Sequence, residues 1–143
     1  MPNTKLVEVA QDTIKITKQG FYEINNKKIN LLSDIYHKFE SVKVYDTEKL
    51  ESIRCDCDDF FENSFNAPKQ CSFYLVDSDS FEAAEGLERP LVMNFANARY
   101  PGGGFLNGAQ AQEESLCRCS TLYESLSSKE AQEVYCYNVL SLL

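Results

Sequence analysis

The sequence has 143 residues, of which 43% are hydrophobic and 25% are charged, and it carries a formal net charge of −8. This length is enough for one ordinary domain with a real core, and the composition is typical of a soluble globular protein. The acidic balance, which no basic run offsets, argues against direct binding of duplex nucleic acid, because such binding needs Lys and Arg to displace counterions. A phosphorylated ligand can still be held locally by backbone N–H groups at a glycine-rich turn or a helix N-terminus.

The sequence carries no signal for a membrane or for secretion. No run of eighteen apolar residues occurs, and residues 1–11 lack the apolar stretch of a signal peptide. We therefore expect an intracellular protein, cytoplasmic or nuclear. The six cysteines include Cys-x-Cys pairs at residues 55–57 and 117–119, which is not the spacing of common zinc ribbons, and His37 lies far from both. We expect free thiols, no metal site and no cofactor.

The N-terminal segment predicts a helix followed by a hairpin. Apolar and threonine side chains recur at three- and four-residue steps over residues 6–17, and Gly20 is placed to end that helix. Residues 21–24 and 28–32 then flank a turn signal at residues 25–27, which is typical of a β-hairpin.

The next stretch is less regular. Residues 42–45 predict another short strand, and Asp46 is placed to cap a helix over residues 47–53. Residues 54–70 are acidic, aromatic and irregular, and we predict no element there.

From residue 71 the pattern changes to alternating strands and helices. Short apolar strands are expected at residues 71–76 and 91–95. Between them, residues 77–80 supply turn and capping groups, and residues 81–87 can form two helical turns.

A loop over residues 97–111 leads into a helix that begins near Gln112. This order of strand, glycine loop and helix places a ligand at the carboxyl end of a strand. The apolar stripe of the helix consists of Leu116, Cys119, Tyr123 and Leu126. The last segment, residues 133–143, is apolar and is expected to begin a further buried strand, which suggests that the chain is a fragment.

Three consecutive glycines, Gly102, Gly103 and Gly104, follow Pro101 in the loop. Consecutive glycines permit positive φ and let a ligand lie against bare backbone, although a flexible turn is the plain alternative. A P-loop is excluded because no Gly-Lys-Ser/Thr follows at the right distance. The dinucleotide fingerprint is excluded because Asn107 stands where its third glycine belongs.

Glu113 and Glu114 lie in the first turn of the helix that follows the loop. Two structural interpretations apply to them. Acidic residues stabilise a helix N-terminus by ~0.3–1 kcal/mol, and Glu114 could pair with Arg118 for ~0.2–0.5 kcal/mol. Both carboxylates also lie off the apolar stripe, and adjacent helical residues diverge by roughly 100°. The two side chains could therefore face different atoms of one ligand.

The triple glycine, seven intervening residues and Gln-Glu-Glu together resemble the signature of poly(ADP-ribose) glycohydrolases, particularly the compact microbial-type branch. Residues 94–97 resemble the strand end that precedes the glycines in that branch, and residues 101–105 and 111–116 match its style closely. The helix and turn at residues 13–22 resemble its accessory N-terminal region. The resemblance runs through most of the chain and is specific around residues 91–126.

This resemblance implies an α/β fold of the macrodomain type, with a mixed sheet between helices in three layers and an N-terminal accessory helix and hairpin. Residues 1–70 would form the accessory region, and residues 71–143 the first part of the catalytic domain. Family catalytic domains run further and add a second glycine-rich loop for the diphosphate and an aromatic near the terminal ribose. Neither is identifiable before Leu143, so the chain is expected to be truncated.

The resemblance also implies roles for individual residues. Glu114 would be the catalytic carboxyl, and Glu113 would grip ribose hydroxyls beside the scissile bond. An asparagine would hydrogen-bond the same ribose, the glycines would close backbone over the sugar and its phosphate, and a glutamine would order the loop. The substrate-binding residues implied in this way are Asn97, Gly102, Gly103, Gly104 and Gln112.

The activity implied is hydrolysis of the ribose–ribose O-glycosidic bonds of poly(ADP-ribose), which releases ADP-ribose, with Glu114 as general acid and base. The substrate would be the polymer or ADP-ribosylated proteins, and no metal is needed. Two alternatives stay open. One is a module that binds ADP-ribose without catalysis, with Glu114 held ionised by Arg118, and the other is an inactive truncated product.

Overall fold

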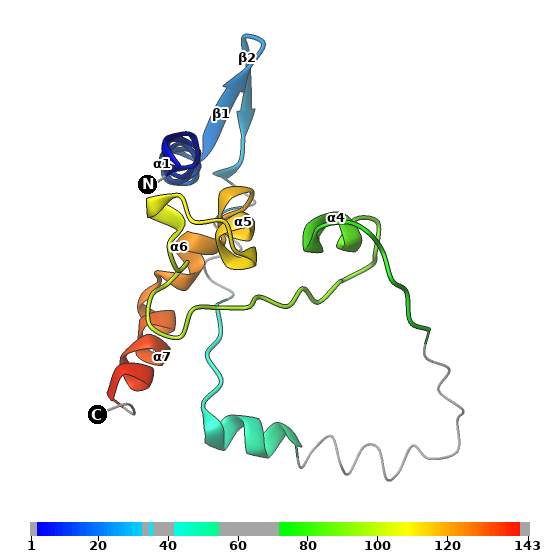
Figure 1. The fold of residues 1–143 in the computed structure, drawn as a ribbon, viewed down its shortest axis with the longest axis vertical. Helices are drawn as coiled ribbons and strands as arrows, with labels where there is room; N and C mark the ends of the chain where they lie inside the picture. Colours follow the sequence, from blue (N-terminus) through cyan, green and yellow to red (C-terminus); the bar gives the residue numbers. More distant parts are fainter. Residues whose placement is uncertain (1–2, 33–34, 36–41, 55–71, 141–143) are drawn as a thin grey trace. The chain divides into compact units, whose positions relative to one another are not determined.

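The structure is a computed structural model, and it describes residues 3–32, 35, 42–54 and 72–140. The contacts divide the chain into two compact units, one of residues 1–43 with 91–143 and one of residues 44–90. Figure 1 shows the helices and the two-stranded hairpin along the chain. No described helix is both long and apolar enough to cross a membrane.

The first unit begins with helix α1, Thr4–Gln19, as the apolar periodicity predicts. The helix ends at Gly20, which adopts φ 72° and donates its N–H to the carbonyl of Ile16 at 2.9 Å. A left-handed residue at this position favours glycine, because a side chain there would be strained. A Cβ at Gly20 would also meet the side chain of Leu32, which would have to shift.

The predicted hairpin is confirmed. Strand β1, Phe21–Ile24, pairs antiparallel with β2, Lys27–Asn30, and the register sets Ile24 opposite Lys27. The turn therefore has two residues, Asn25 and Asn26, and both have positive φ (52° and 60°). Asparagine tolerates this conformation, and a two-residue turn of this kind matches the twist of the strands.

The second unit contains two short helices with side-chain caps. Residues 47–54 are helical, and Asp46 accepts the N–H of Lys49 at 2.8 Å, as predicted. Helix α4, Ser80–Ala84, begins with a capping box between Asp79 and Glu82. It is shorter than the predicted helix at residues 81–87. The predicted strand at residues 42–45 is wrong, because these residues form no ladder with any strand of the described chain.

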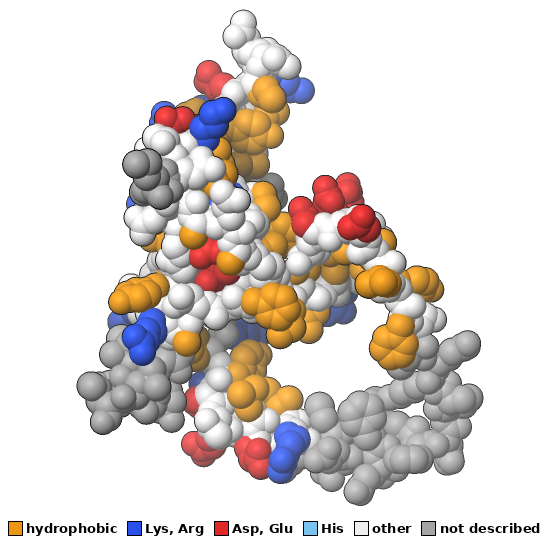
Figure 2. Space-filling view, in the orientation of Figure 1, with side chains coloured by type: hydrophobic (Ala, Val, Ile, Leu, Met, Phe, Trp, Pro, Cys, Tyr) orange, Lys and Arg blue, Asp and Glu red, His pale blue; other side chains and the backbone are white. Residues whose placement is uncertain are grey.

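The two apolar strands predicted at residues 71–76 and 91–95 are also wrong. Residue 71 lies outside the described residues, and 72–76 and 91–95 are extended without a ladder, since β1–β2 is the only strand pairing in the described part of the chain. Leu75 and Leu91 are about fully exposed, at 102% and 100%. Figure 2 shows hydrophobic side chains at the surface along the extended chain on both sides of α4. An apolar pattern favours a strand, but a strand forms only where a partner supplies hydrogen bonds.

The predicted helix from Gln112 is interrupted. Helix α5 covers Gln112–Arg118 and helix α6 covers Leu122–Leu126. Ser120 separates them, because its hydroxyl donates to the carbonyl of Leu116 at 2.7 Å and accepts the N–H of Leu122 at 3.2 Å. Cys119 of the predicted stripe is therefore exposed.

The core of the first unit lies where α1 meets the loop and α5. Its fully buried members are Ala10, Phe105 and Cys117, and Phe105 belongs to the short 3₁₀ helix η1, Phe105–Asn107. Partly buried side chains pack against this cluster, namely Ile14, Leu122, Tyr123 and Leu126.

The C-terminal segment is a helix, so the strand predicted at residues 133–143 is wrong where it can be compared. Helix α7 covers Lys129–Leu140, and residues 141–143 lie outside the described residues. The hydroxyl of Ser128 accepts the N–H of Ala131 at 3.2 Å, and this bond caps the first turn.

Candidate active site

Helix α5 directs two adjacent carboxylates into the glycine loop. Glu113 is 3% exposed and Glu114 is 7% exposed. Charged side chains are rarely buried to this extent unless they are paired or hydrogen-bonded. The sequence predicts two carboxylates off the apolar stripe, and the structure shows why they can leave solvent: the loop backbone folds over both.

Both oxygens of Glu113 accept hydrogen bonds from the segment before the glycines. Oε2 accepts the backbone N–H of Asn97 at 2.8 Å, and Oε1 accepts the side-chain Nδ2 of Asn94 at 3.4 Å. These bonds fix the carboxylate in one orientation and tie α5 to the end of the extended segment.

Glu114 is held by one oxygen only. Its Oε1 accepts the N–H of Gly104 at 2.8 Å, whereas its Oε2 is buried and has no hydrogen-bond partner among the described residues. The interpretation of Glu114 as an ion-pair partner of Arg118 is not supported, because the ion pairs between described residues do not include Glu114. Arg118 instead donates to the carbonyl of Ala109 at 2.7 Å and to the hydroxyl of Ser115 at 3.2 Å.

The three glycines bring backbone into contact with these carboxylates. Gly102 and Gly103 have φ of 69° and 55°. A Cβ at Gly103 would lie 2.5 Å from Oε1 of Glu114 and 3.2 Å from Oε2 of Glu113. The N–H of Gly103 donates to the carbonyl of Tyr100 at 3.0 Å, and that of Gly104 to Glu114. These two N–H groups therefore donate within the protein itself.

Gln112 joins the helix to the extended segment. Its Oε1 accepts the N–H of Phe95 at 2.9 Å, and its Nε2 donates to the carbonyl of Met93 at 2.8 Å. The side-chain amide thus occupies the place of one residue of a neighbouring strand. The two hydrogen bonds hold the segment before the glycines against α5, and the role that the resemblance implies for Gln112 stays a prediction.

Asn97 forms the turn that leads into the glycines. Its Oδ1 accepts the N–H groups of Arg99 and Tyr100 at 2.8 and 2.9 Å, while its own N–H donates to Glu113. This is a local side-chain turn of the kind that asparagine favours. The Nδ2 group is the part of the side chain that is left to donate to a ligand.

Helix α1 supports the loop from behind, a contribution that the sequence patterns do not reveal. The hydroxyl of Thr13 lies 2.8 Å from the carbonyl of Arg118, the last residue of α5. Gly108, with φ 74°, ends η1 so closely against the start of α1 that a Cβ would lie 2.8 Å from the carbonyl oxygen of Asn3. Threonine at Thr13 fits the helical periodicity equally well without this contact, so no signal in the sequence distinguishes it.

Burial and the two carboxylates together change the titration of neighbouring groups. Burial of the Cys117 thiol, followed by the negative charges of Glu113 and Glu114, raises its pKa from 9.0 to about 12. Burial, and then the charge of Glu113, raises the pKa of Tyr135 in α7 as well. Both effects favour the neutral form of a group whose ionised form is anionic.

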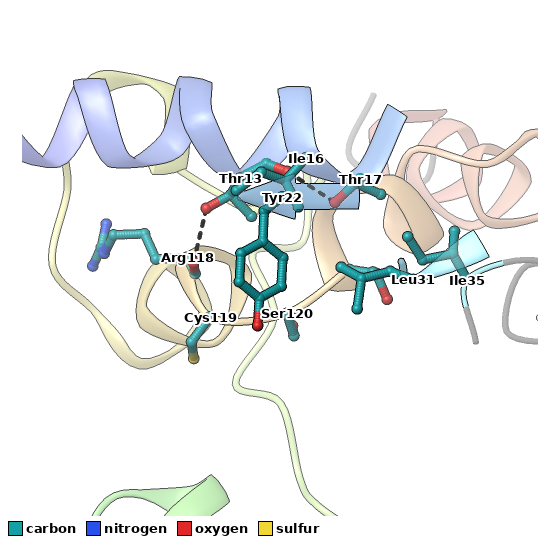
Figure 3. A pocket seen from close by; sticks show the side chains of 10 residues that line it. Thr13, Ile16, Thr17, Tyr22, Leu31, Ile35, Arg118, Cys119 and Ser120 are labelled. Atoms are coloured by element: carbon teal, nitrogen blue, oxygen red, sulfur yellow. Dashed lines mark hydrogen bonds between the residues drawn. The ribbon is translucent and has the colours of Figure 1, made fainter. Parts of the chain in front are cut away.

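A separate cavity of about 410 Å³ lies between α1, the hairpin and the turn after α5. Figure 3 shows Tyr22 reaching across it and the Thr13–Arg118 hydrogen bond along one wall. None of the predicted site residues lines it. In the described part of the chain, no group of three or more His, Cys, Asp or Glu is placed to hold a metal ion.

Comparison with known proteins gives a family whose model, described as "Microbial-type PARG, catalytic domain", matches residues 10–141. The chain belongs to this family. A solved structure of poly(ADP-ribose) glycohydrolase (PARG) from Thermomonospora curvata is 26% identical, with a TM-score of 0.74 over 98% of this chain and 51% of that one. A second structure from the same organism, bound to the inhibitor ADP-HPD, is 24% identical, with a TM-score of 0.67 over 97% and 49%. No curated protein matches the chain.

These matches confirm the predicted membership of the microbial-type PARG family and the predicted fold class. The chain spans about half the length of the solved relatives. It follows their fold even though the predicted strands at residues 72–76 and 91–95 form no ladder within it. The domain boundary at residue 70 and the roles of individual site residues stay predictions.

Proposed function

We propose that this chain carries the catalytic loop of a poly(ADP-ribose) glycohydrolase and that Glu114 is its general acid and base. The observation that carries the proposal is the asymmetry of Glu114, whose Oε1 is fixed by Gly104 while Oε2 is buried without a partner among the described residues. A buried polar atom normally has a partner. A ligand at this loop would supply one, and family membership names the class of ligand.

The chemistry assigned to Glu114 follows from this geometry. With a proton on Oε2, the carboxyl donates it to the ribose oxygen that leaves as the C–O glycosidic bond breaks. The resulting carboxylate then takes a proton from water as the water oxygen bonds to the anomeric carbon, and Glu114 returns to its starting form. The bond from Gly104 holds the carboxyl in place through both steps. Acid–base help of this kind contributes roughly 10²–10⁴-fold to the rate.

Glu113 has a different part in the proposal. Because both of its oxygens accept bonds from Asn94 and Asn97, it is a carboxylate engaged in holding the loop, and it is poorly placed to move a proton. It orients the segment against which the ribose lies and can accept a ribose hydroxyl beside its present bonds, since a carboxylate has about four acceptor sites. The backbone at Gly102 and Gly103 leaves space for the sugar to approach closely.

The proposed substrate is poly(ADP-ribose), or proteins that carry it, with no cofactor. The relative from Thermomonospora curvata has been solved with the inhibitor ADP-HPD, which supports a ligand of this class at the matching fold. Since the chain spans about half of the solved relatives, the activity, substrate and partners of the whole protein all belong to the proposal.

A second candidate function is binding of ADP-ribose without catalysis. The observation that favours it is that the two carboxylates accept three hydrogen bonds from the loop and the segment before it, so that their burial has a structural explanation. If this candidate is correct, Glu114→Gln should leave binding of ADP-ribose unchanged and should affect only the stability of the loop.

The deciding experiment measures release of ADP-ribose from a defined polymer, with binding of ADP-ribose measured in parallel. Glu114→Gln keeps the shape of the side chain and should lower hydrolysis by about 10²–10⁴-fold while binding changes little. Glu113→Gln should weaken binding and turnover together and leave measurable activity. Glu130→Gln, an exposed carboxylate on α7, is the control and should behave as wild type. Near-normal hydrolysis by Glu114→Gln would reject the assignment and favour the binding module.

A further inference from the structure

Asn94 is fixed in the wall of the proposed site by the residues on either side of it. The carbonyl of Met93 and the N–H of Phe95 are both bonded to the side-chain amide of Gln112. Met93 and Phe95 direct their side chains outward, each 69% exposed, and Asn94 between them is half-buried. This alternation is that of an extended chain with one inward face. The backbone clamp therefore points Asn94 toward the carboxylates.

The orientation of the Asn94 amide is set by Glu113. Its Nδ2 donates to Oε1 of Glu113 at 3.4 Å. Rotating the amide by 180° would set its oxygen against a carboxylate oxygen, and two acceptors repel each other. The second oxygen of Glu113 is held by the N–H of Asn97, so this carboxylate cannot turn away to accept the rotated amide. The acceptor end of Asn94 is thus turned away from Glu113.

That acceptor has no partner in the described part of the chain. Oδ1 of Asn94 and Oε2 of Glu114 are the two buried side-chain atoms of the described residues without a hydrogen bond. Both belong to residues next to Glu113, either in sequence or by contact. Buried acceptors of this kind normally have a hydrogen-bond partner, and a buried acceptor without one destabilises the fold. A ligand that brings hydroxyl groups supplies donors for both.

The neighbouring asparagine cannot take this part. Oδ1 of Asn97 already accepts two backbone N–H groups, from Arg99 and Tyr100. What Asn97 has left is a donor, Nδ2, whereas what Asn94 has left is an acceptor. A sugar hydroxyl donates one hydrogen and accepts others, so a wall with one free amide donor and one free amide acceptor suits it.

We infer that Asn94 is a substrate-binding residue, whose Oδ1 accepts a hydrogen bond from a hydroxyl of the ribose next to Glu114. This inference rests on the proposed function, and it adds a residue that the signature around the glycines does not include. Glu113 then has a second role. Because it holds Nδ2 of Asn94, Glu113 orients Oδ1 of Asn94 toward the sugar.

The test combines a variant with ligands that lack single hydroxyl groups. Calorimetry compares ADP-ribose with two analogues that lack either the 2- or the 3-hydroxyl of the terminal ribose, on wild type, Asn94→Ala and the control Asn107→Ala. Asn107 lies in the same loop with an exposed side chain. Loss of one hydrogen bond should weaken ADP-ribose binding by Asn94→Ala about 3- to 10-fold. For one of the analogues, Asn94→Ala should bind no more weakly than wild type.

The outcomes separate this inference from the function on which it rests. An equal loss for all three ligands would show that Asn94 only shapes the loop, and would overturn the inference while the catalytic assignment stands. If Asn94→Ala does not fold, wild type alone decides, because equal affinity for the three ligands also overturns it. Failure of wild type to bind ADP-ribose at all would overturn the proposed function itself.

Discussion

Two parts of this protein each carry eight hydrophobic residues, and they end in different states. In the first, residues 97–118 fold into a loop and helix whose buried polar groups nearly all have partners, and Phe105 and Cys117 are fully buried beneath them. In the second, residues 72–76 and 91–95 are extended and expose their apolar side chains. The loop needs only contacts that α1 and α5 supply. The extended segments need strands to pair with, and the described chain supplies none.

The comparison separates structure that forms between residues near in sequence from structure that needs a distant partner. Turns, caps and the approach of Gly103 to Glu114 join residues within about a dozen positions of one another. Each therefore forms with little loss of chain entropy. A ladder at residues 91–95 needs a partner from elsewhere, and the solved relatives are about twice as long as this chain.

The largest effect is expected from closing the space between the glycine loop and the carboxylates. Gly103→Ala places a Cβ 2.5 Å from Oε1 of Glu114 at a position with φ 55°. We expect binding of ADP-ribose to weaken by at least about 10-fold and the melting temperature to fall, because backbone strain at such a position amounts to roughly 1–3 kcal/mol and the clash adds to it. Calorimetry and a thermal melt measure the two effects.

Gly86→Ala is the matched control for that variant. Gly86 has φ 80°, yet a Cβ there meets nothing within 4 Å. It should therefore show the strain without the clash, with a lower melting temperature and unchanged binding. If both variants bind ADP-ribose as wild type does, the loop does not shape the site.

A smaller effect is expected from adding charge to the exposed apolar segments. The unpaired edges and apolar side chains at residues 72–76 and 91–95 should make the 143-residue chain self-associate and bind a hydrophobic dye. Leu75→Lys and Leu91→Lys should reduce both, because charge on an unpaired strand discourages pairing with another chain. Sedimentation velocity distinguishes the self-associated chain from the monomer. A sharply melting monomer of wild type, with no dye binding, would show that these segments are covered.

How far the sequence predicts this protein differs between the same two regions. The helix ending at Gly20, the hairpin, the caps at Asp46 and Asp79 and the start of α5 all follow from local patterns, and all are confirmed. The strand predictions rest on apolar character alone, which indicates that a segment is buried but not which strand it pairs with.

The candidate site shows the same limit. The glycines, Gln112 and the paired carboxylates are recognised from their spacing, because the residues that must touch lie close in sequence. Asn94, Thr13 and Cys117 enter the site through contacts that depend on how α1, α5 and the extended segment pack. The predicted stripe through Cys119 is wrong for a related reason, since the helix is interrupted after Arg118 and Cys117, not Cys119, is the buried cysteine.

The smallest effect on the folded protein concerns Cys117, and it reports on the closed state of the loop. A Cβ at Gly102 would lie 3.5 Å from its Sγ, so the thiol lies directly beneath the glycines. Burial and the charges of Glu113 and Glu114 raise the pKa of Cys117 to about 12. At pH 8 the thiol is therefore almost wholly protonated and should be alkylated far more slowly than the exposed Cys119.

The same shift predicts a dependence of stability on pH with a definite sign. Because the folded pKa of Cys117, about 12, lies above the ordinary value of 9.0, its contribution to the free energy of unfolding is complete below pH 9 and is lost as pH rises toward 12. Urea unfolding between pH 9 and pH 12 measures this effect. The free energy of unfolding should fall more steeply with pH for wild type and Cys119→Ala than for Cys117→Ala. Peptide mapping after alkylation at pH 8 gives the independent readout. Equal labelling of the two cysteines would mean that the loop does not stay closed over Cys117, and that the burial of Glu113 and Glu114 beside it is equally transient.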